Sequence, residues 1–535
     1  MSAAGPNRPH PHRVRDCVGV AGFTIAVLLP TIAMPLGPDQ SALACAARRI
    51  LEGRPPYLDV TYLFPGSSLL YACALRLFGD AARSIHLLDV LFATLAAVLL
   101  YLLASHLFDR AGALAAGLAY SLMYVEVGYW NYAQTDAFLN PTLLLVLLCW
   151  LKAVDSSQAR WTLTAGAALA VAALCRVSAL AIVICLPIIA MASMTPYSAR
   201  RLCGLAGGTI AGAGVTLGGV AGAAIWSGYN LQDFFMVWTV VVPNHVARHS
   251  GATDGFWLRG FLAGCDFLLV NGNTLLAVAA ILGTMPLLLR LRRQQSAWMI
   301  PAYAVATLVM AAAQRRFSAY HWLPTIPPWC LLAACALSLR FEFARLEPMR
   351  RQRLQAAYLA LSVLLFLLAE RRQVLRYRDL IGLMTSPRWR ANYDRQFHTR
   401  PPFIAFSARE ERNAAEYVMM NSAPDDGLFV WGFAPGVYFL SKRDTPALWM
   451  YHVYFDVPAL AASGRTSYVE SVMLAAPPIV IIRRDQPPPP GTRWHDASAD
   501  LDALPELRDF IQREYVRVEQ FAYLEVHKRK PPEKR

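Results

Sequence analysis

Asp39 is an acidic residue whose position in this 535-residue chain suits proton transfer. It directly follows the first apolar segment and precedes a run of residues that favours a helix. A carboxylate that is partly removed from water at such a point could act as a general base. The same position also suits an N-cap residue, whose side chain accepts hydrogen bonds from the first N–H groups of a helix.

A second acidic position is Asp136, which lies where the chain enters another apolar segment, ten residues after Glu126. Its carboxylate could bind a ligand, or it could cap the helix that follows. Acidic residues are scarce in the apolar part of the chain, and those that occur in such regions commonly serve function. We therefore keep Asp136 and Glu126 as candidates for ligand binding.

Arg315 and Arg316 form a basic pair at the end of an apolar segment, and Tyr320 and His321 follow closely. Guanidinium groups present forked hydrogen-bond donors that suit a phosphate. Their long side chains could instead extend to lipid headgroups. Arg176 interrupts a long apolar run and could be either a turn residue or a second phosphate contact.

No cluster of residues indicates a metal or another cofactor. His245 and His249 have the i, i+4 spacing of metal ligands on a helix, but no third ligand is evident, so we expect a solvated loop there. The ten cysteines form no CxxC pair and are expected to be small buried apolar residues. We expect no cofactor, with a divalent cation left open.

Composition places these residues in a membrane protein. Hydrophobic residues make up 56% of the chain and charged residues only 16%, against about 25% charged in a soluble domain. The net charge of +14 could suggest a nucleic-acid partner, but the basic residues of the apolar part lie in short loops. The positive-inside rule explains that distribution, and we expect no binding of nucleic acid.

The sequence contains eleven apolar segments that we predict to be long enough to cross a bilayer. Arg8, Arg13 and Arg15 precede the first segment, which we expect to be retained and to leave the N-terminus in the cytoplasm. An odd number of spans then puts the C-terminal part on the outer face. The segments are 17–35, 86–107, 112–127, 137–153, 161–175, 177–194, 203–226, 261–289, 297–313, 320–339 and 354–370.

The charged residues are concentrated after residue 370, which predicts a polytopic α-helical membrane protein with a C-terminal α/β domain. We expect a transmembrane module over 1–370, whose first outer loop, 36–85, carries juxtamembrane helices. A linker over 371–400 and a soluble domain over 401–535 follow. Within these parts the patterns favour helices at 41–51, 67–78, 409–421 and 504–515, and strands at 428–431, 478–482, 516–521 and 523–526.

Several patches resemble the bacterial GT-C glycosyltransferases of the protein O-mannosyltransferase and aminoarabinose transferase group. The strongest patch is the first loop, with an acid after the first span, then LEGRPPYLD at 51–59 and FPGSSLLY at 64–71. Gln-Thr-Asp at 134–136 resembles the second acidic motif of the group, and Arg-Phe-Ser-Ala-Tyr-His at 316–321 resembles its basic-aromatic loop. The chain departs from the group at Gln40, where Glu is common, and in the order of Tyr320 and His321.

The resemblance implies a transferase that moves a sugar from a polyprenyl-phosphate donor to an acceptor hydroxyl, with inversion at the anomeric carbon. The acceptor is a lipid, a polysaccharide or a protein, and the expected setting is the outer face of a bacterial inner membrane, among its lipids. Asp39 is then the expected general base, and the basic pair holds the phosphate. Substrate contacts are expected from Asp136, Glu126, Arg176, Arg315, Arg316, Tyr320 and His321.

This interpretation requires Asp39 and the basic pair to converge on one extracytoplasmic crevice. The main alternative is a transporter or flippase for lipid-linked sugars, which would use charges near the bilayer midplane and often an internal repeat. Neither feature is evident in the sequence. A scaffold without catalytic activity is a second alternative, opposed only by the set of candidate residues.

Overall fold

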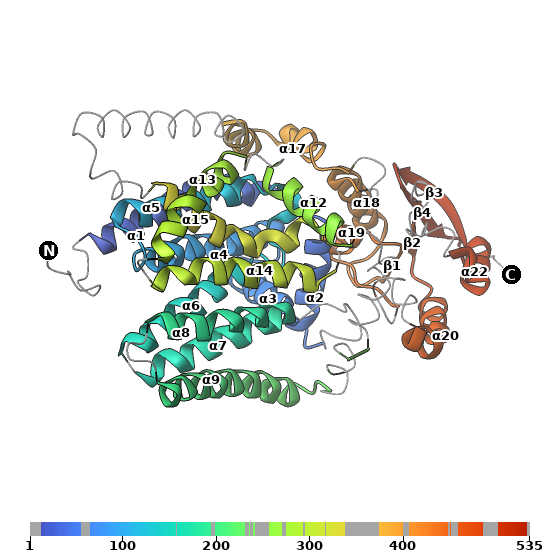
Figure 1. Cartoon of the computed structure of the whole chain (residues 1–535). Helices are drawn as coiled ribbons and strands as arrows, with labels where there is room; N and C mark the ends of the chain where they lie inside the picture. The colour runs from blue at the N-terminus through green and yellow to red at the C-terminus, as the bar shows by residue number, and fades with distance from the viewer. Residues whose placement is uncertain are drawn as a thin grey trace. The chain divides into compact units, whose positions relative to one another are not determined.

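The structure is a computed structural model of the chain. It describes residues 12–54, 65–156, 158–193, 198–230, 235, 239–240, 256–269, 274–292, 295–315, 317–337, 374–399, 406–447, 450, 458–484 and 501–531. Contacts divide the chain into two units, labelled by element in Figure 1. The first comprises Met1–Ile32, His86–Trp226 and His249–Leu380, and the second comprises Ala33–Ile85, Ser227–Arg248 and Ile381–Arg535.

The described part of the first unit is helical. Its α-helices are α1 (Arg13–Leu28), α4 (Ala82–Ala104), α5 (Arg110–Glu126), α6 (Leu139–Ser156), α7 (Ala159–Cys175), α8 (Cys185–Ser193), α9 (Ala199–Trp226), α12 (Phe256–Leu269), α13 (Thr274–Leu291), α14 (Met299–Ala313) and α15 (Ile326–Leu337). Short 3-10 segments join or extend them: η1 (Leu29–Ala33), η2 (Tyr129–Asn131), η3 (Val177–Ile184), η5 (Gln295–Trp298) and η6 (Ala319–Thr325). Residues 374–385 are also helical.

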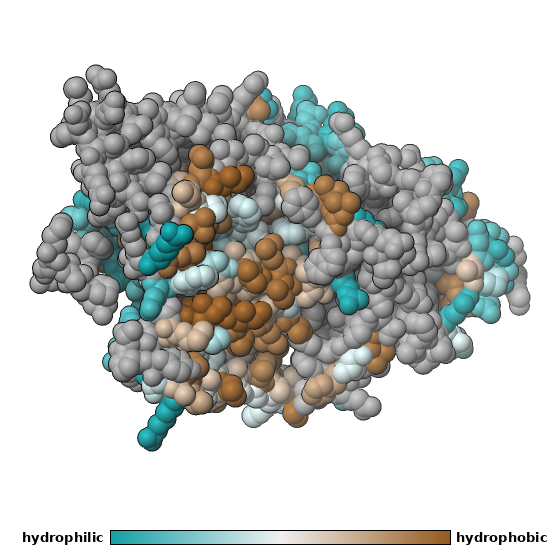
Figure 2. All heavy atoms as spheres, viewed as in Figure 1, coloured by the Kyte–Doolittle hydropathy of each residue, from teal (hydrophilic) through white to brown (hydrophobic). Residues whose placement is uncertain are grey.

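Several described helices have the length and composition of membrane spans. Among the described residues, five helical stretches are long and apolar enough to cross a bilayer: Arg13–Ala33, Ala82–Ala104, Leu139–Ser156, Ala199–Trp226 and Gln295–Ala313. Two shorter apolar helices, Ala159–Cys175 and Val177–Met191, accompany them. Large apolar side chains stay exposed on α13 and α14, among them Ile281, Met285 and Val305, and Figure 2 shows hydrophobic residues gathered over the helices of this unit. A multi-pass membrane protein accounts for these surfaces.

Two of the predicted spans are not fully described. The span expected over 261–289 contains the end of α12, which is described to Leu269, and most of α13, which is described from Thr274. Residues 270–273 and the predicted span 354–370 lie outside the described residues, so the total of eleven stays a prediction.

Helix α9 packs on α7 through glycines. A Cβ on Gly166 of α7 would lie 2.0 Å from the carbonyl oxygen of Thr209, and one on Gly212 of α9 would lie 2.2 Å from that of Leu163. The two backbones therefore approach at a distance that only glycine permits, as in other membrane helix pairs. On the rest of α9, Gly214, Gly218 and other glycines would place a Cβ in open space.

The described part of the second unit combines helices with a mixed sheet. Its helices are α2 (Pro38–Leu51), α3 (Pro65–Phe78), α17 (Pro387–Asp394), α18 (Ala408–Asn421), α19 (Pro435–Ser441), α20 (Pro458–Ala475) and α22 (Pro505–Glu514). Its strands are β1 (Leu428–Trp431), β2 (Ile479–Arg483), β3 (Tyr515–Phe521) and β4 (Leu524–Arg529), in the order β1-β2-β4-β3. Strands β1 and β2 are parallel and wholly buried, and the other pairs are antiparallel.

The segment expected to be the first outer loop makes its contacts within this second unit. Helix α2 packs on α3, and it also packs on α19, which follows the first strand of the sheet. The expected helices and strands of both segments are present within a few residues of their predicted bounds. Contacts thus group 36–85 with the C-terminal sheet, whereas the sequence analysis assigned this segment to the membrane module.

Glu411 on α18 is a buried acid that lies against the first turn of α19. A Cβ on Gly436 would lie 1.9 Å from its Oε2. Burial raises the pKa of Glu411 to about 8, although the Arg483 guanidinium, the Tyr523 hydroxyl and the Gly436 N–H each act to lower it. The folded protein therefore favours the neutral acid at this position.

The packing of α7 on α9 predicts a sharp difference between two glycines. Gly166→Ala should lower the apparent melting temperature of the detergent-purified protein by several degrees, because its new Cβ meets backbone that cannot rotate away. Gly218→Ala, in the open part of α9, should leave the melting temperature unchanged or slightly higher. Equal melting temperatures for the two variants would contradict the described packing.

Burial of Glu411 predicts a pH dependence of stability. Because its folded pKa is raised, the folded protein holds a proton that the unfolded chain has released above about pH 4.5, and stability falls as pH rises toward about 8. Glu411→Gln cannot ionise and should remove that part of the loss. Melting temperatures of both proteins between pH 5 and pH 9 test this, and parallel profiles would refute the assignment.

Candidate functional site

Asp136 is fully buried and joins three parts of the first unit. Its Oδ2 lies 2.7 Å from Nη2 of Arg176, and its Oδ1 accepts a hydrogen bond of 3.0 Å from Nε2 of Gln314. Arg176 separates α7 from η3, and Gln314 is the C-cap residue of α14. Sequence analysis had proposed both Asp136 and Arg176, but it did not pair them and it missed Gln314.

The pairing explains why Arg176 can interrupt an apolar run. An isolated charge in the interior of a membrane protein is costly, whereas a carboxylate with a guanidinium and an amide donor is largely compensated. Arg176 has extended backbone angles at the end of α7, so it also ends the helix. Arg176 is thus the residue that ends α7, with Asp136 as its charge partner, and its contact with a phosphate stays a prediction.

Arg315 follows Gln314 directly and has an unusual backbone conformation. Its φ is +55°, and that of Phe317 is +51°, a region that non-glycine residues adopt at a cost of about 1–3 kcal/mol each. The Arg315 side chain is exposed. Arg316 lies outside the described residues. A strained backbone next to an exposed guanidinium is typical of a functional site, where the surroundings hold the strain.

Aromatic packing fixes the part of the loop that follows Arg315. The Phe317 ring stacks on Trp322, with their centroids 6.2 Å apart. Two glycines of α12 receive these rings: a Cβ would lie 2.6 Å from Phe317 at Gly260 and 2.8 Å from Trp322 at Gly264. The loop is therefore fixed by Gln314 before Arg315 and by the glycine face of α12 after it.

Tyr320 and His321 lie at the start of η6, with their rings edge to face and centroids 4.5 Å apart. His321 is buried and Tyr320 is partly exposed. Asn140 on α6 donates a hydrogen bond of 3.2 Å to the carbonyl oxygen of Leu323, which ties η6 to the helix that follows Asp136. Of the two predicted residues, Tyr320 is the more accessible to a ligand.

Glu126 is buried at the end of α5, close to an arginine that the sequence analysis did not identify. Arg376 donates a hydrogen bond of 2.9 Å to the carbonyl oxygen of Val125 and another of 3.4 Å to the hydroxyl of Tyr132. A cation at the C-terminal end of a helix is favourable for the helix dipole. Arg376 falls in the segment expected to be a linker, where only its proximity to the last apolar run could have marked it.

Asp39 lies in the second unit, near the beginning of α2. The N-cap residue is Gly37 and Pro38 is the first helical residue, so Asp39 occupies the first turn rather than the cap. An acid in the first turn is favourable for the helix dipole. The side chain is partly exposed, while the neighbouring Gln40 and Ser41 are buried. Because Arg315 belongs to the first unit, the convergence of Asp39 with the basic pair stays a prediction.

Metal-binding groups are not evident in the part of the chain that the structure describes. No three His, Cys, Asp or Glu side chains gather there in a way that could hold a metal ion. His245 and His249 lie outside the described residues. Of the ten cysteines, six are buried, but Cys73 and Cys203 are exposed, so the expected burial holds only in part.

The ion pair between Asp136 and Arg176 predicts a large stability effect. Asp136→Asn can still accept the hydrogen bond from Gln314 but leaves Arg176 without its countercharge, which should cost about 3–5 kcal/mol. Adding Arg176→Gln removes the unpaired charge and should restore most of the loss. Denaturation of the purified protein in detergent measures both effects, and additive losses in the double variant would contradict the pairing.

Comparisons with known proteins relate part of the chain to a family. Residues 61–226 match the family described as dolichyl-phosphate-mannose-protein mannosyltransferase. The matched region contains Asp136 and Arg176 and ends before Arg315. None of the curated proteins matches the chain.

The fold is similar to that of two solved structures. One is ArnT from Cupriavidus metallidurans bound to undecaprenyl phosphate, with a TM-score of 0.58 and 14% identity over 96% of this chain and 97% of that chain. The other is the apo form of the oligosaccharyltransferase from Archaeoglobus fulgidus, with a TM-score of 0.50 and 12% identity over 88% of this chain and 69% of that chain. Residues 61–226 therefore carry a domain of this mannosyltransferase family, and the chain as a whole has a fold similar to that of ArnT.

Proposed function

We propose that the protein transfers a sugar from a polyprenyl-phosphate donor to an acceptor hydroxyl. The observation that carries this proposal is the family match over 61–226, because the family's name refers to a mannosyltransferase and to a sugar linked to a lipid phosphate. A fold shared over nearly the whole of ArnT, which was solved with undecaprenyl phosphate bound, supports the same donor class. The acceptor is a lipid, a polysaccharide or a protein.

The proposed setting is the outer face of a bacterial inner membrane. The N-terminus then lies in the cytoplasm and the segment 401–535 lies outside, as the distribution of basic residues favours. A polyprenyl chain needs apolar surface between or beside helices, and its phosphate comes to rest at headgroup depth. The exposed apolar side chains of α13 and α14 are compatible with such a neighbour.

We assign the binding of the donor phosphate to the basic loop, which is the segment that begins with the basic pair Arg315 and Arg316. Arg315 presents an exposed guanidinium on a backbone that packing holds in place, and Arg316 follows it in the sequence. As the bond between the anomeric carbon and the phosphate oxygen breaks, negative charge grows on the phosphate. A fixed guanidinium stabilises that charge without reorganisation at the moment of reaction. Tyr320, partly exposed in the same segment, is assigned to the sugar.

Asp39 is assigned as the general base. The acceptor oxygen attacks the anomeric carbon, its proton passes to the Asp39 carboxylate, and the polyprenyl phosphate departs with the bonding electrons. A single in-line displacement of this kind inverts the configuration at the anomeric carbon. The scheme requires no metal ion, since the phosphate leaves as a stabilised anion and needs no proton.

The other residues expected at the site are proposed to support it. Asp136 and Arg176 neutralise each other, and Asp136 holds Gln314, the residue before Arg315. We therefore assign both residues an indirect role in substrate binding, which is to hold the loop that carries Arg315 in position. Glu126 and His321 are both buried, and they are proposed to form part of the wall around the substrates.

Asp39→Asn should reduce turnover about 10²–10⁴-fold, because it removes the base while keeping the size of the side chain. The purified protein is offered a panel of polyprenyl-phosphate sugars, and consumption of donor lipid is measured. Asp509→Asn, which changes an exposed acid on α22, is the control and should turn over at the wild-type rate.

The same assay distinguishes the competing functions. Donor consumption that depends on Asp39 supports the transferase, and the anomeric configuration of the product tests the inversion. Movement of lipid-linked sugar across vesicle membranes without consumption would instead identify a flippase. Wild-type turnover by Asp39→Asn would show that another group accepts the proton.

A further inference from the structure

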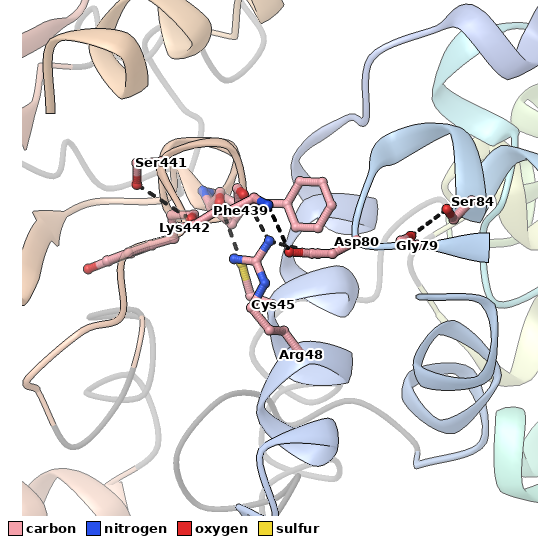
Figure 3. Close-up of polar contacts among 10 residues, drawn as sticks. Cys45, Arg48, Gly79, Asp80, Ser84, Phe439, Ser441 and Lys442 are labelled. Carbon is pink, nitrogen blue, oxygen red and sulfur yellow. Dashed lines mark hydrogen bonds and ion pairs between the residues drawn. The ribbon is translucent and has the colours of Figure 1, made fainter. Parts of the chain in front are cut away.

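Helix α2 carries Asp39 in its first turn and is held at its other end by charged contacts. Nη2 of Arg48 donates hydrogen bonds of 2.9 Å to Oδ1 of Asp80 and 3.0 Å to the carbonyl oxygen of Phe439. The guanidinium also lies 4.8 Å from the centroid of the Phe439 ring. Lys442 reaches the other oxygen of Asp80 at 3.7 Å. Figure 3 shows Arg48 between Asp80 and the α19 segment.

Asp444 provides a second anchor for the same end of α2. Its carboxylate lies 3.5 Å from Nη2 of Arg49 and accepts a hydrogen bond from Arg54. Its own carbonyl oxygen accepts a hydrogen bond of 2.9 Å from the N–H of Leu428, the first residue of β1. Asp444 therefore connects Arg49 of α2, and Arg54 just beyond the helix, to the beginning of the buried sheet.

The contacts with α19 and its flanking residues follow one face of α2. Ser41, Cys45 and Arg48 have the i, i+4, i+7 spacing of a single helix face. Sγ of Cys45 lies 3.7 Å from the carbonyl oxygen of Pro435, and a Cβ on Gly436 would lie 3.5 Å from Oγ of Ser41. At about 100° per residue, Asp39 falls on roughly the opposite side of the helix from these three residues. The α19 segment thus contacts α2 from behind Asp39 and leaves the acid's own side unobstructed by these contacts.

We propose that the α19 segment and Asp444 position the general base through α2. In this arrangement Arg48, Asp80 and Asp444 are positioning residues that touch no substrate, and the inference rests on the proposed role of Asp39. The pair of Arg48 with Asp80 is partly exposed, and such ion pairs contribute little to folding. The reaction is far more sensitive, because a displacement of about 1 Å in a catalytic group can cost about 10²-fold in rate.

The test compares turnover by variants of the full-length protein. Arg48→Met and Asp80→Asn should each lower kcat about 10–100-fold, with the KM for the donor lipid changed less than about threefold. Arg48→Lys keeps the charge beside Asp80 but not the planar contact with Phe439, and it should fall between wild type and Arg48→Met. Arg513→Met, which removes an exposed arginine paired at 2.9 Å with Glu514 on α22, is the matched control.

A double-mutant cycle with Asp39→Asn separates positioning from a general structural role. If Arg48 acts through Asp39, Arg48→Met should change the residual rate of the Asp39→Asn protein less than about twofold. A purely structural loss would reduce the rate in both backgrounds by the same factor. Rates are normalised to folded protein, measured by size exclusion in detergent.

Each outcome has one meaning. Wild-type turnover by Asp39→Asn would remove the proposed base, whatever Arg48→Met does. An inactive Asp39→Asn together with Arg48→Met and Asp80→Asn at the rate of Arg513→Met would overturn the positioning role alone. Equal losses from Arg48→Met in both backgrounds, or a loss that vanishes on normalisation to folded protein, would also overturn it.

Discussion

A charge in the interior of a membrane protein must have a partner, and the ion pair of Asp136 with Arg176 satisfies that requirement at the centre of the candidate site. The pair joins the beginning of α6 to the break between α7 and η3. Through Gln314 it extends to the end of α14, and so to the strained backbone at Arg315. Removing either charge would leave the other without its countercharge. The basic loop therefore depends on an acid that lies 179 positions earlier in the sequence.

The second unit holds in place a short helix, α2, that carries Asp39. A helix of fourteen residues such as α2 is marginally stable by itself in water, so its position must come from packing and from contacts at its ends. The sheet provides them through Asp444 and through the residues around α19. The C-terminal part of the chain is thereby a structural extension of the first loop, although more than 300 residues separate them in the sequence.

Much of the fold could be predicted from the sequence, because local patterns determine where helices and strands form. The four strands and the helices α2, α3 and α18 follow directly from apolar periodicity and turn residues. The cap reading of Asp39 was wrong, since Pro38 is a typical first helical residue and makes Gly37 the cap. Pairings could not be predicted in the same way. Asp136 meets Arg176 and Gln314, and Arg48 meets Asp80, only because distant segments pack together, and no local pattern records which acid will meet which base.

The backbone around Arg315 has a further consequence. Both Arg315 and Phe317 have positive φ, and the aromatic ring of Phe317 is seated on Gly260, so packing fixes the described backbone on this side of the loop. Under the proposed function, such preorganisation would lower the entropic cost of binding the donor phosphate. Selection among anionic lipids would then depend on how well a headgroup fits a rigid frame.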